Sequence, residues 1–165
     1  MSKKTKNLAP TVHPKAGEID RANPDWRLDL VRNGVPCACC GKIEYPYVHN
    51  ICNCHSHGLI ERHGAKYEFQ MVLEYPISVV GFVLNELGYR VRAGEVFRPG
   101  DLVEGIFEDC QVRLDKFTDC DGRPILRVVI PDGYNRWPED PACDPKYQLQ
   151  RLPLVQLRNP RYLAY

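Results

Sequence analysis

Two short segments of the chain concentrate the residue types that bind metals. Five of the eight cysteines and two of the five histidines lie within residues 37–42 and 52–57. Cys37 and Cys40 are separated by two residues and followed by Gly41, which is typical of a tight turn that aims two thiolates at one ion. Zinc needs only four soft or borderline donors in a tetrahedron, so the cluster predicts a zinc site.

The second segment departs from a regular zinc ribbon, because Cys52 and Cys54 are separated by one residue instead of two. In an extended strand these cysteines face one side, while His55 and His57 face the other. Two arrangements follow: four cysteines close a structural site, or the two histidines join one or two cysteines in a site that is open to water. The candidate metal ligands are Cys37, Cys40, Cys52, Cys54, His55 and His57.

The same residues also allow interpretations without zinc. Free cysteines often behave as small buried hydrophobic residues, and a pair of histidines can simply be hydrogen-bonded. Cys54 with His49 or His57 could form a thiol nucleophile and its base. An iron–sulfur cluster is the less usual alternative, because its ligands seldom include histidine.

An open metal site corresponds to a small metal-dependent hydrolase. In that hypothesis His55 and His57 hold a zinc-bound water near Asp132, and these three residues are the catalytic candidates. Asp132 belongs to a turn-rich segment, residues 131–138, whose alternative interpretation is a structured loop held in place by Trp137.

The rest of the chain predicts the elements that position these residues. Asn23 and Pro24 favour the start of a short helix that ends at Gly34. The other expected elements are strands at 45–52 and 67–73 with a loop at 53–66 between them, a deeply buried helix over 76–87 that stops at Gly88, and extended runs at 102–117 and 124–130 joined by a turn at Asp121-Gly122. This order indicates an α+β fold: one compact mixed-sheet domain with one buried helix, a short N-terminal helix and extended tails.

Length and charge complete the domain organisation. A chain of 165 residues suits one domain, which we expect at 23–145 between an extended or disordered basic arm at 1–22 and a basic, partly apolar tail at 146–165. The net charge is +1, and Lys3, Lys4 and Lys6 together with the four basic residues of the tail carry +7, which leaves −6 for residues 7–145. Basic ends of this kind are usually solvated, but they can also neutralise the phosphates of a nucleic acid.

The sequence gives no sign of secretion or of a membrane span. The charged first residues are not followed by the apolar stretch of a signal peptide, and no apolar run approaches the roughly 20 residues of a membrane helix. We therefore expect a cytoplasmic protein with reduced thiols. The function expected first is a zinc-stabilised binding or accessory protein that docks on a larger protein through its tails; a metal-dependent hydrolase and a nucleic-acid-binding protein are the alternatives.

Three short motifs resemble a known family. They are His55-Ser56-His57-Gly58-Leu59 with Gly64 before a strand, Gly94-Glu95-Val96-Phe97-Arg98-Pro99-Gly100, and Pro131-Asp132 leading to Arg136-Trp137-Pro138. Together they resemble the bacterial family called domain of unknown function 4262 over residues 45–150. The resemblance implies a compact α+β domain in a bacterial or phage setting and no established reaction. The Cys37–Cys40 segment lies outside the matched region.

Overall fold

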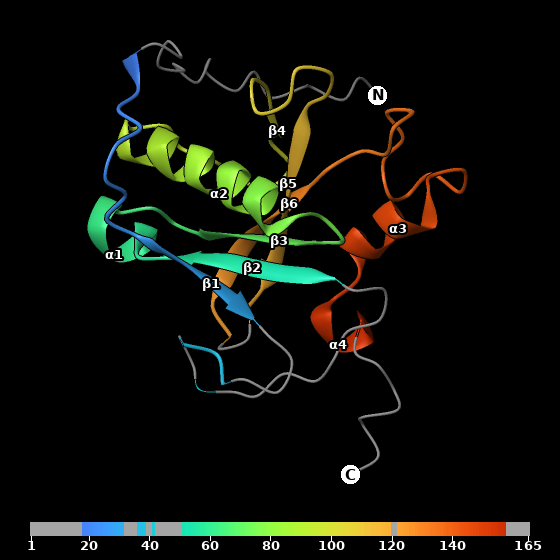
Figure 1. Cartoon of the computed structure of the whole chain (residues 1–165), viewed down its shortest axis with the longest axis horizontal. Helices are drawn as coiled ribbons and strands as arrows, with labels where there is room; N and C mark the ends of the chain where they lie inside the picture. Colours follow the sequence, from blue (N-terminus) through green and yellow to red (C-terminus); the bar gives the residue numbers. More distant parts are fainter. Residues whose placement is uncertain (1–17, 32–35, 39–40, 42–50, 120–121, 158–165) are drawn as a thin grey trace, which may run out of the picture.

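One six-stranded sheet organises the chain in a computed structural model that describes residues 18–31, 36–38, 41, 51–119 and 122–157 (Figure 1). The strand order is β1-β2-β3-β6-β5-β4. The bounds are β1 Arg27–Val31, β2 Cys52–His57, β3 Glu68–Leu73, β4 Leu102–Val103, β5 Val112–Thr118 and β6 Pro124–Val129. All neighbouring strands are antiparallel except β3 and β6, which are parallel. The expected α+β class with one mixed sheet is confirmed.

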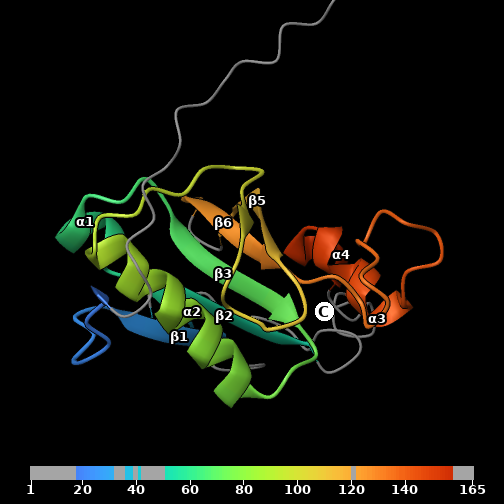
Figure 2. The same cartoon turned by 90° about the horizontal axis from the view of Figure 1, so that it is seen from above.

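Helix α2 (Ile77–Arg92) lies across one face of this sheet (Figure 2). Its buried apolar side chains pack with those of the strands into the main core, and they are Val80, Val83, Leu84, Leu87 and Val91. The sequence predicted hardly any exposed surface on this helix. Phe82 is nevertheless 56% exposed and Ile77 50% exposed. Near its start, the helix is therefore buried on its inner side and exposed on its outer side.

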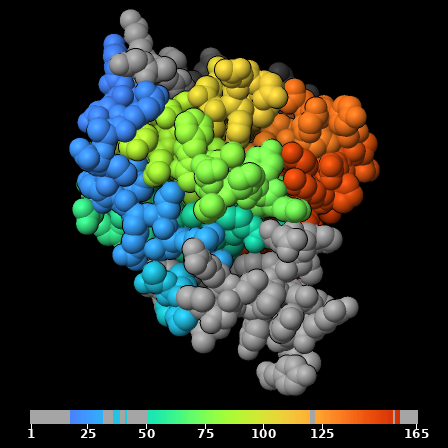
Figure 3. Space-filling view, in the orientation of Figure 1, coloured from blue at the N-terminus to red at the C-terminus, as the bar shows by residue number. Residues whose placement is uncertain are grey.

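The prediction that α2 stops at Gly88 is wrong, because the helix continues to Arg92 and the chain turns at Gly94 with φ of 100°. Gly88 is buried inside the helix, where a Cβ would meet two atoms of the Trp26 indole at 2.6 Å. Glycine is therefore needed here for close approach of a ring and not for a turn. Segment 18–26, which carries Trp26, packs beside α2 (Figure 3).

The predicted N-terminal helix is also wrong, since residues 27–31 form strand β1. Leu28 and Leu30 alternate with Arg27 and Asp29, so the period of two fits as well as the helical spacing of Trp26 and Leu30. Pairing with β2 decides between the two patterns, and residues 32–34 of the predicted helix lie outside the described residues.

Two further segments differ from expectation. The expected strand at 45–52 can be compared only at residues 51 and 52, and the expected loop at 53–66 instead contains most of β2 and helix α1 (Leu59–His63). The extended run at 102–117 is two strands, β4 and β5, separated by residues 104–111. The expected hairpin between the last two strands is confirmed by the antiparallel pairing of β5 and β6, and Gly122 turns there with φ of 88°.

The C-terminal segment packs on the domain itself. It contains α3 (Pro145–Gln148), a 3-10 helix η3 (Leu149–Arg151) and α4 (Leu154–Leu157), which lie at one end of the sheet (Figure 1). Leu157 packs with Val72 of β3 on the sheet face opposite α2, so the second face gains a small apolar cluster of its own. Residues 145–157 are thus part of the fold and not an extended tail; residues 158–165 lie outside the described part.

Candidate functional site

Residues 52–57 form strand β2 and not the expected loop, so their side chains alternate between the two faces of the sheet, as the sequence argument anticipated for an extended segment. Cys52 and Cys54 contribute to the core beneath α2, where Cys54 is 2% exposed. Burial raises the pKa of the Cys54 thiol to about 12, and the neighbouring Cys52 and Asp29 act in the same direction. A thiol in this environment is protonated at neutral pH, so Cys54 behaves as a small hydrophobic residue in this structure.

His55 lies on the opposite face, beside β1. It is 1% exposed, and its Nε2 atom is 3.7 Å from Oδ2 of Asp29 and has no hydrogen-bond partner among the described residues. Burial lowers the pKa of His55 below its usual 6.5, and the carboxylates of Asp29 and Asp119 offset only part of this effect. The ring is therefore neutral at physiological pH and closed to water, which does not suit a catalytic residue.

His57, at the end of β2, is bound to an arginine. Its Nδ1 atom lies 2.8 Å from Nη1 of Arg123, whose Nε donates to Oδ2 of Asp119 at 3.2 Å. An arginine can only donate, so Nδ1 of His57 accepts and its proton is on Nε2. His55 and His57 share a face of β2, but no group of three or more His, Cys, Asp or Glu side chains that could hold a metal occurs among the described residues.

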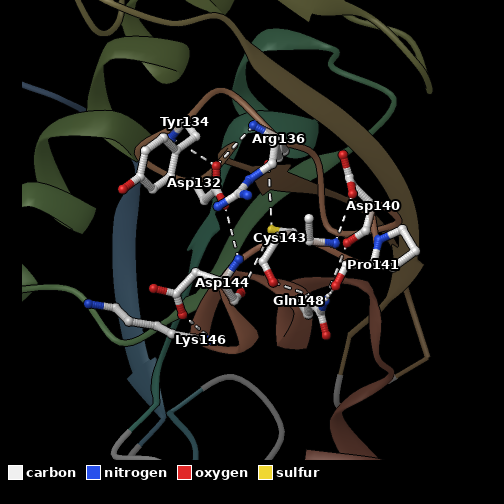
Figure 4. Close-up of polar contacts among 10 residues, drawn as sticks. Asp132, Tyr134, Arg136, Asp140, Pro141, Cys143, Asp144, Lys146 and Gln148 are labelled. Atoms are coloured by element: carbon white, nitrogen blue, oxygen red, sulfur yellow. Dashed lines mark hydrogen bonds and ion pairs between the residues drawn. The ribbon is translucent and has the colours of Figure 1, made fainter.

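Asp132 organises the loop that follows β6 (Figure 4). Its carboxylate accepts backbone N–H groups of Tyr134, Arg136 and Asp144 at 2.9–3.0 Å, and Nε of Arg136 at 2.9 Å. Burial alone would raise the pKa of Asp132, but these donors outweigh it and lower the pKa well below its usual range. Among the described residues, the hydrogen bonds of this carboxylate are all with its own loop, as the structured-loop interpretation predicts.

The three catalytic candidates are not brought together. Strand β6 runs parallel to β3 and ends at Val129, so Asp132, three residues later, lies at the end of the sheet near Leu73. Strand β2 runs antiparallel to β3, so His57 lies near the other end of the sheet. Cys54 and His57 face opposite sides of β2, which removes that thiol–imidazole pair, and His49 lies outside the described residues.

The first half of the predicted metal cluster is described in part. Cys37 is buried, and its carbonyl oxygen accepts the N–H of Gly41 at 2.8 Å. Gly41 has φ of 70°, in the left-handed region that the sequence argument required of it. Cys40 lies outside the described residues, so the zinc site stays a prediction.

A groove that the sequence did not predict lies between residues 104–111 and the 131–137 loop. Its volume is about 650 Å³, and its lining includes the aromatic residues Phe107 and Trp137. The charged residues among its lining are Glu104, Glu108 and Asp109, all exposed. The only signal in the sequence is the presence of three carboxylates in six residues, within a segment whose pattern otherwise predicts a strand.

One rim of this groove is held by a network of charges. The Arg113 guanidinium lies 4.9 Å from the centre of the Trp137 ring, and it is paired with Asp115 at 2.7 Å and with Glu139 at 2.6 Å. These two carboxylates raise the pKa of Arg113 although burial opposes them. These contacts fix the Trp137 ring in position, and the charge of Arg113 is balanced by the two carboxylates.

Comparison with known proteins assigns no family. The chain matches no protein-family model, no curated protein and no solved structure. The resemblance to domain of unknown function 4262 is thus still an expectation. Within the described parts of the chain, no helix combines the length and apolar character needed to cross a membrane.

Proposed function

We propose that this chain is a binding protein that docks on a larger protein by holding a lysine- and arginine-rich segment of it in the groove between residues 104–111 and 131–137. The supporting observation is the groove's composition. Glu104, Glu108 and Asp109 line it together with the rings of Phe107 and Trp137, and no lysine or arginine is among its described lining residues.

Each part of the groove suits an extended basic peptide. A single exposed ion pair contributes only about 0–1 kcal/mol, so affinity must come from several carboxylates acting on one segment. Aromatic faces attract ammonium and guanidinium groups, and Arg113 occupies only one position over the Trp137 ring. This recognition is electrostatic in large part, and we expect it to weaken as salt is added.

The alternatives receive less support from the described residues. The hydrolase hypothesis needs His55, His57 and Asp132 at one place, and their positions on the sheet separate His57 from Asp132. The apolar residues of the C-terminal tail indicate docking either on its own domain or on a partner, and Leu157 packs against Val72 of the same chain. The acidic groove is therefore the surface to which we assign the binding function.

A fluorescein-labelled hexa-arginine peptide tests the proposal. We expect saturable binding by fluorescence anisotropy, with a change in the emission of Trp137, and at least tenfold weaker binding to the Glu104→Gln/Glu108→Gln/Asp109→Asn variant. The matched control removes three exposed carboxylates elsewhere, as Glu18→Gln/Glu61→Gln/Glu74→Gln, and should bind within about twofold of the wild type. Equal losses in both variants would show that net charge, and not the groove, attracts the peptide.

We also propose that zinc stabilises the Cys37–Cys40 segment. The support is local: Gly41 has the left-handed backbone and donates to the carbonyl of Cys37 at 2.8 Å, as a turn that aims two thiolates at one ion needs. A structural zinc would lock this turn and contribute to folding.

Elemental analysis of the purified protein tests the zinc proposal. We expect close to one zinc ion per chain, and loss of both zinc and thermal stability in Cys37→Ser and Cys40→Ser. Cys110→Ser, which changes a half-buried thiol outside the cluster, should keep the metal. Metal-free wild-type protein that melts cooperatively would disprove the proposal without affecting the groove.

A further inference from the structure

The first described segment of the chain is fastened beside the acidic groove by a relay of contacts through α2. Nε and Nη2 of Arg21 donate to the carboxylate oxygens of Glu86 at 2.8 and 2.9 Å. Glu86 also accepts from Nε of Arg90 at 3.1 Å, and Nη1 of Arg90 donates to the carbonyl oxygen of Glu104 at 2.9 Å. Glu104 lines the groove. Only two side chains therefore separate Arg21 from the rim of the groove.

Contacts within the groove place two of its three carboxylates against the lining. Oε1 of Glu104 accepts Nε2 of Gln111, another lining residue, at 2.9 Å. The Asp109 carboxylate lies beside the thiol of Cys110, which also lines the groove; burial raises the pKa of this thiol, and Asp109 adds to the shift. Among the described residues, neither these two carboxylates nor that of Glu108 forms an ion pair. The groove thus presents three carboxylates to a basic segment.

The sequence supplies a basic segment that belongs to the same chain. Lys3, Lys4 and Lys6 place three ammonium groups within four residues, and we call residues 3–6 the lysine segment. Lys6 precedes Glu18 by 12 positions, and Lys3 precedes it by 15. An extended chain spans about 3.3 Å per residue, so these connections can reach about 40–50 Å. This reach is far more than the two side chains of the relay cover.

We propose that the lysine segment binds in the acidic groove of its own chain, with its three ammonium groups on the three carboxylates. The inference rests on the proposed function, because the lysine segment is then a basic segment of the kind that the groove holds in a partner. A connection of this length gives an effective concentration in the millimolar range, so contacts that are too weak between separate molecules are sufficient within one chain. A partner's basic segment must displace the lysine segment, which lowers the apparent affinity for the partner.

Hexa-arginine binding to a chain without the three lysines tests the proposal. We expect Lys3→Gln/Lys4→Gln/Lys6→Gln to bind the fluorescein-labelled peptide at least about threefold more tightly than the wild type, because no competitor within the chain remains. The matched control removes three exposed cations elsewhere, as Arg62→Gln/Lys66→Gln/Lys116→Gln, and should bind within about twofold of the wild type.

The outcomes of this titration separate the two proposals. Equal tightening in both variants would show that net charge controls the affinity, and it would overturn the inference. Groove binding that is unchanged in the lysine variant would also overturn the inference, while the proposed function would stand. If none of the three proteins binds hexa-arginine, both proposals fail.

Two-dimensional NMR of the ¹⁵N-labelled full chain locates the contact. Between the wild type and the lysine variant, we expect shift differences at residues 104–111 and 135–137 that do not depend on protein concentration. A synthetic peptide of residues 1–8, added to the lysine variant, should restore the wild-type shifts, but not in a chain that also carries Glu104→Gln/Glu108→Gln/Asp109→Asn. The proposal is overturned if the groove signals do not differ, or if the differences grow with protein concentration, which would place the lysine segment on a second copy.

Discussion

Two adjacent rows of side chains cross the sheet on opposite faces, and they are held by different forces. On the α2 face, Leu30, Cys54 and Met71 lie side by side in β1, β2 and β3, and Val128 and Leu114 pair in β6 and β5. One residue away, on the other face, the row is entirely polar: Asp29, His55, Gln70, Arg127 and Asp115. The first four polar residues of this row are nevertheless buried.

The polar row is held by hydrogen bonds between particular partners, whereas the apolar row is held by the burial of apolar surface. Arg127 is fully buried, donates from Nε to Gln70 at 2.9 Å, and lies 3.7 Å from the centre of the Phe117 ring. Its Nη1 donates to the carbonyl oxygens of Gln150 and Leu152. The arginine thereby ties the C-terminal segment to the sheet, and a buried polar group of this kind is costly as soon as a partner is lost.

The largest effect is expected from Arg127→Met. The substitution keeps most of the volume but leaves the Gln70 side chain, the buried Gln150 carbonyl and the part-buried Leu152 carbonyl without their donor, so we expect a loss of about 4 kcal/mol in the free energy of unfolding. Urea denaturation measures it. In Gln70→Leu/Arg127→Met part of the lost stability should be regained, because no side-chain amide is left without a partner. If the destabilisation of the double variant equals the sum of the two single variants, the two residues are not coupled.

Met71→Ala tests the apolar row at the neighbouring position. Met71 is fully buried beneath α2, so its truncation leaves a cavity and should cost about 3 kcal/mol. Unlike the polar row, this position should respond to shape alone, and Met71→Leu should cost less than about 1.5 kcal/mol. A loss in Met71→Leu as large as that in Met71→Ala would contradict a core that depends only on filling space.

Two glycines of α2 should respond in opposite directions to the same change. In Gly88→Ala the new methyl group would meet the Trp26 indole at 2.6 Å, so we expect a loss of about 2 kcal/mol. In Gly81→Ala the nearest atom is the Leu28 Cδ1 at 3.8 Å, so alanine's better helix propensity should add about 0.5–1 kcal/mol. Thermal unfolding of both variants measures the two changes in stability. Equal losses of stability would contradict the expectation that packing dominates at Gly88 and helix propensity at Gly81.

A similarly small effect is expected from the ion pair that fastens the N-terminal segment to α2. Oxygens of Glu86 accept from Nε and Nη2 of Arg21 at 2.8 and 2.9 Å. The hydrogen bond from Arg21 lowers the pKa of Glu86 below 4.5, burial opposes the shift, and Arg90 adds to it. The contribution to stability is therefore complete above the ordinary pKa and is lost as the pH falls through the lowered one.

Melting temperatures from about pH 6 to about pH 3 test this ion pair. Near pH 6 the free energy of unfolding of the wild type should exceed that of Glu86→Gln by about 1 kcal/mol. This difference should shrink toward pH 3. The exposed residue Glu74 is the control, since Glu74→Gln should follow the wild type throughout. A difference that stays constant with pH would mean that the carboxylate's charge plays no part.

Several features of the fold and of the candidate site could be predicted from residue patterns alone. The segments predicted as strands at 67–73 and 124–130 contain strands β3 and β6, and the apolar side chains of α2 mark the core. The expected loop at 53–66 missed the strand at 52–57, but the rule that side chains of an extended segment alternate does place Cys54 and His55 on opposite faces. The cysteine spacing likewise predicts the left-handed backbone of Gly41. These are local properties, and local geometry determines them.

The remaining features depend on which distant segments meet, and a single sequence leaves that open. Residues 27–31 fit a helix or a strand, and hydrogen bonds to β2 decided for the strand. The apolar run around Arg127 predicts a strand, but the partners that hold the buried guanidinium, Gln70 and Gln150, come from distant segments. The separation of His57 from Asp132, and the groove whose walls come from distant segments, likewise follow from strand order. Residue types thus determined what chemistry this chain can offer, while tertiary pairing decided which groups are exposed, because burial and partners are set by contacts across the fold.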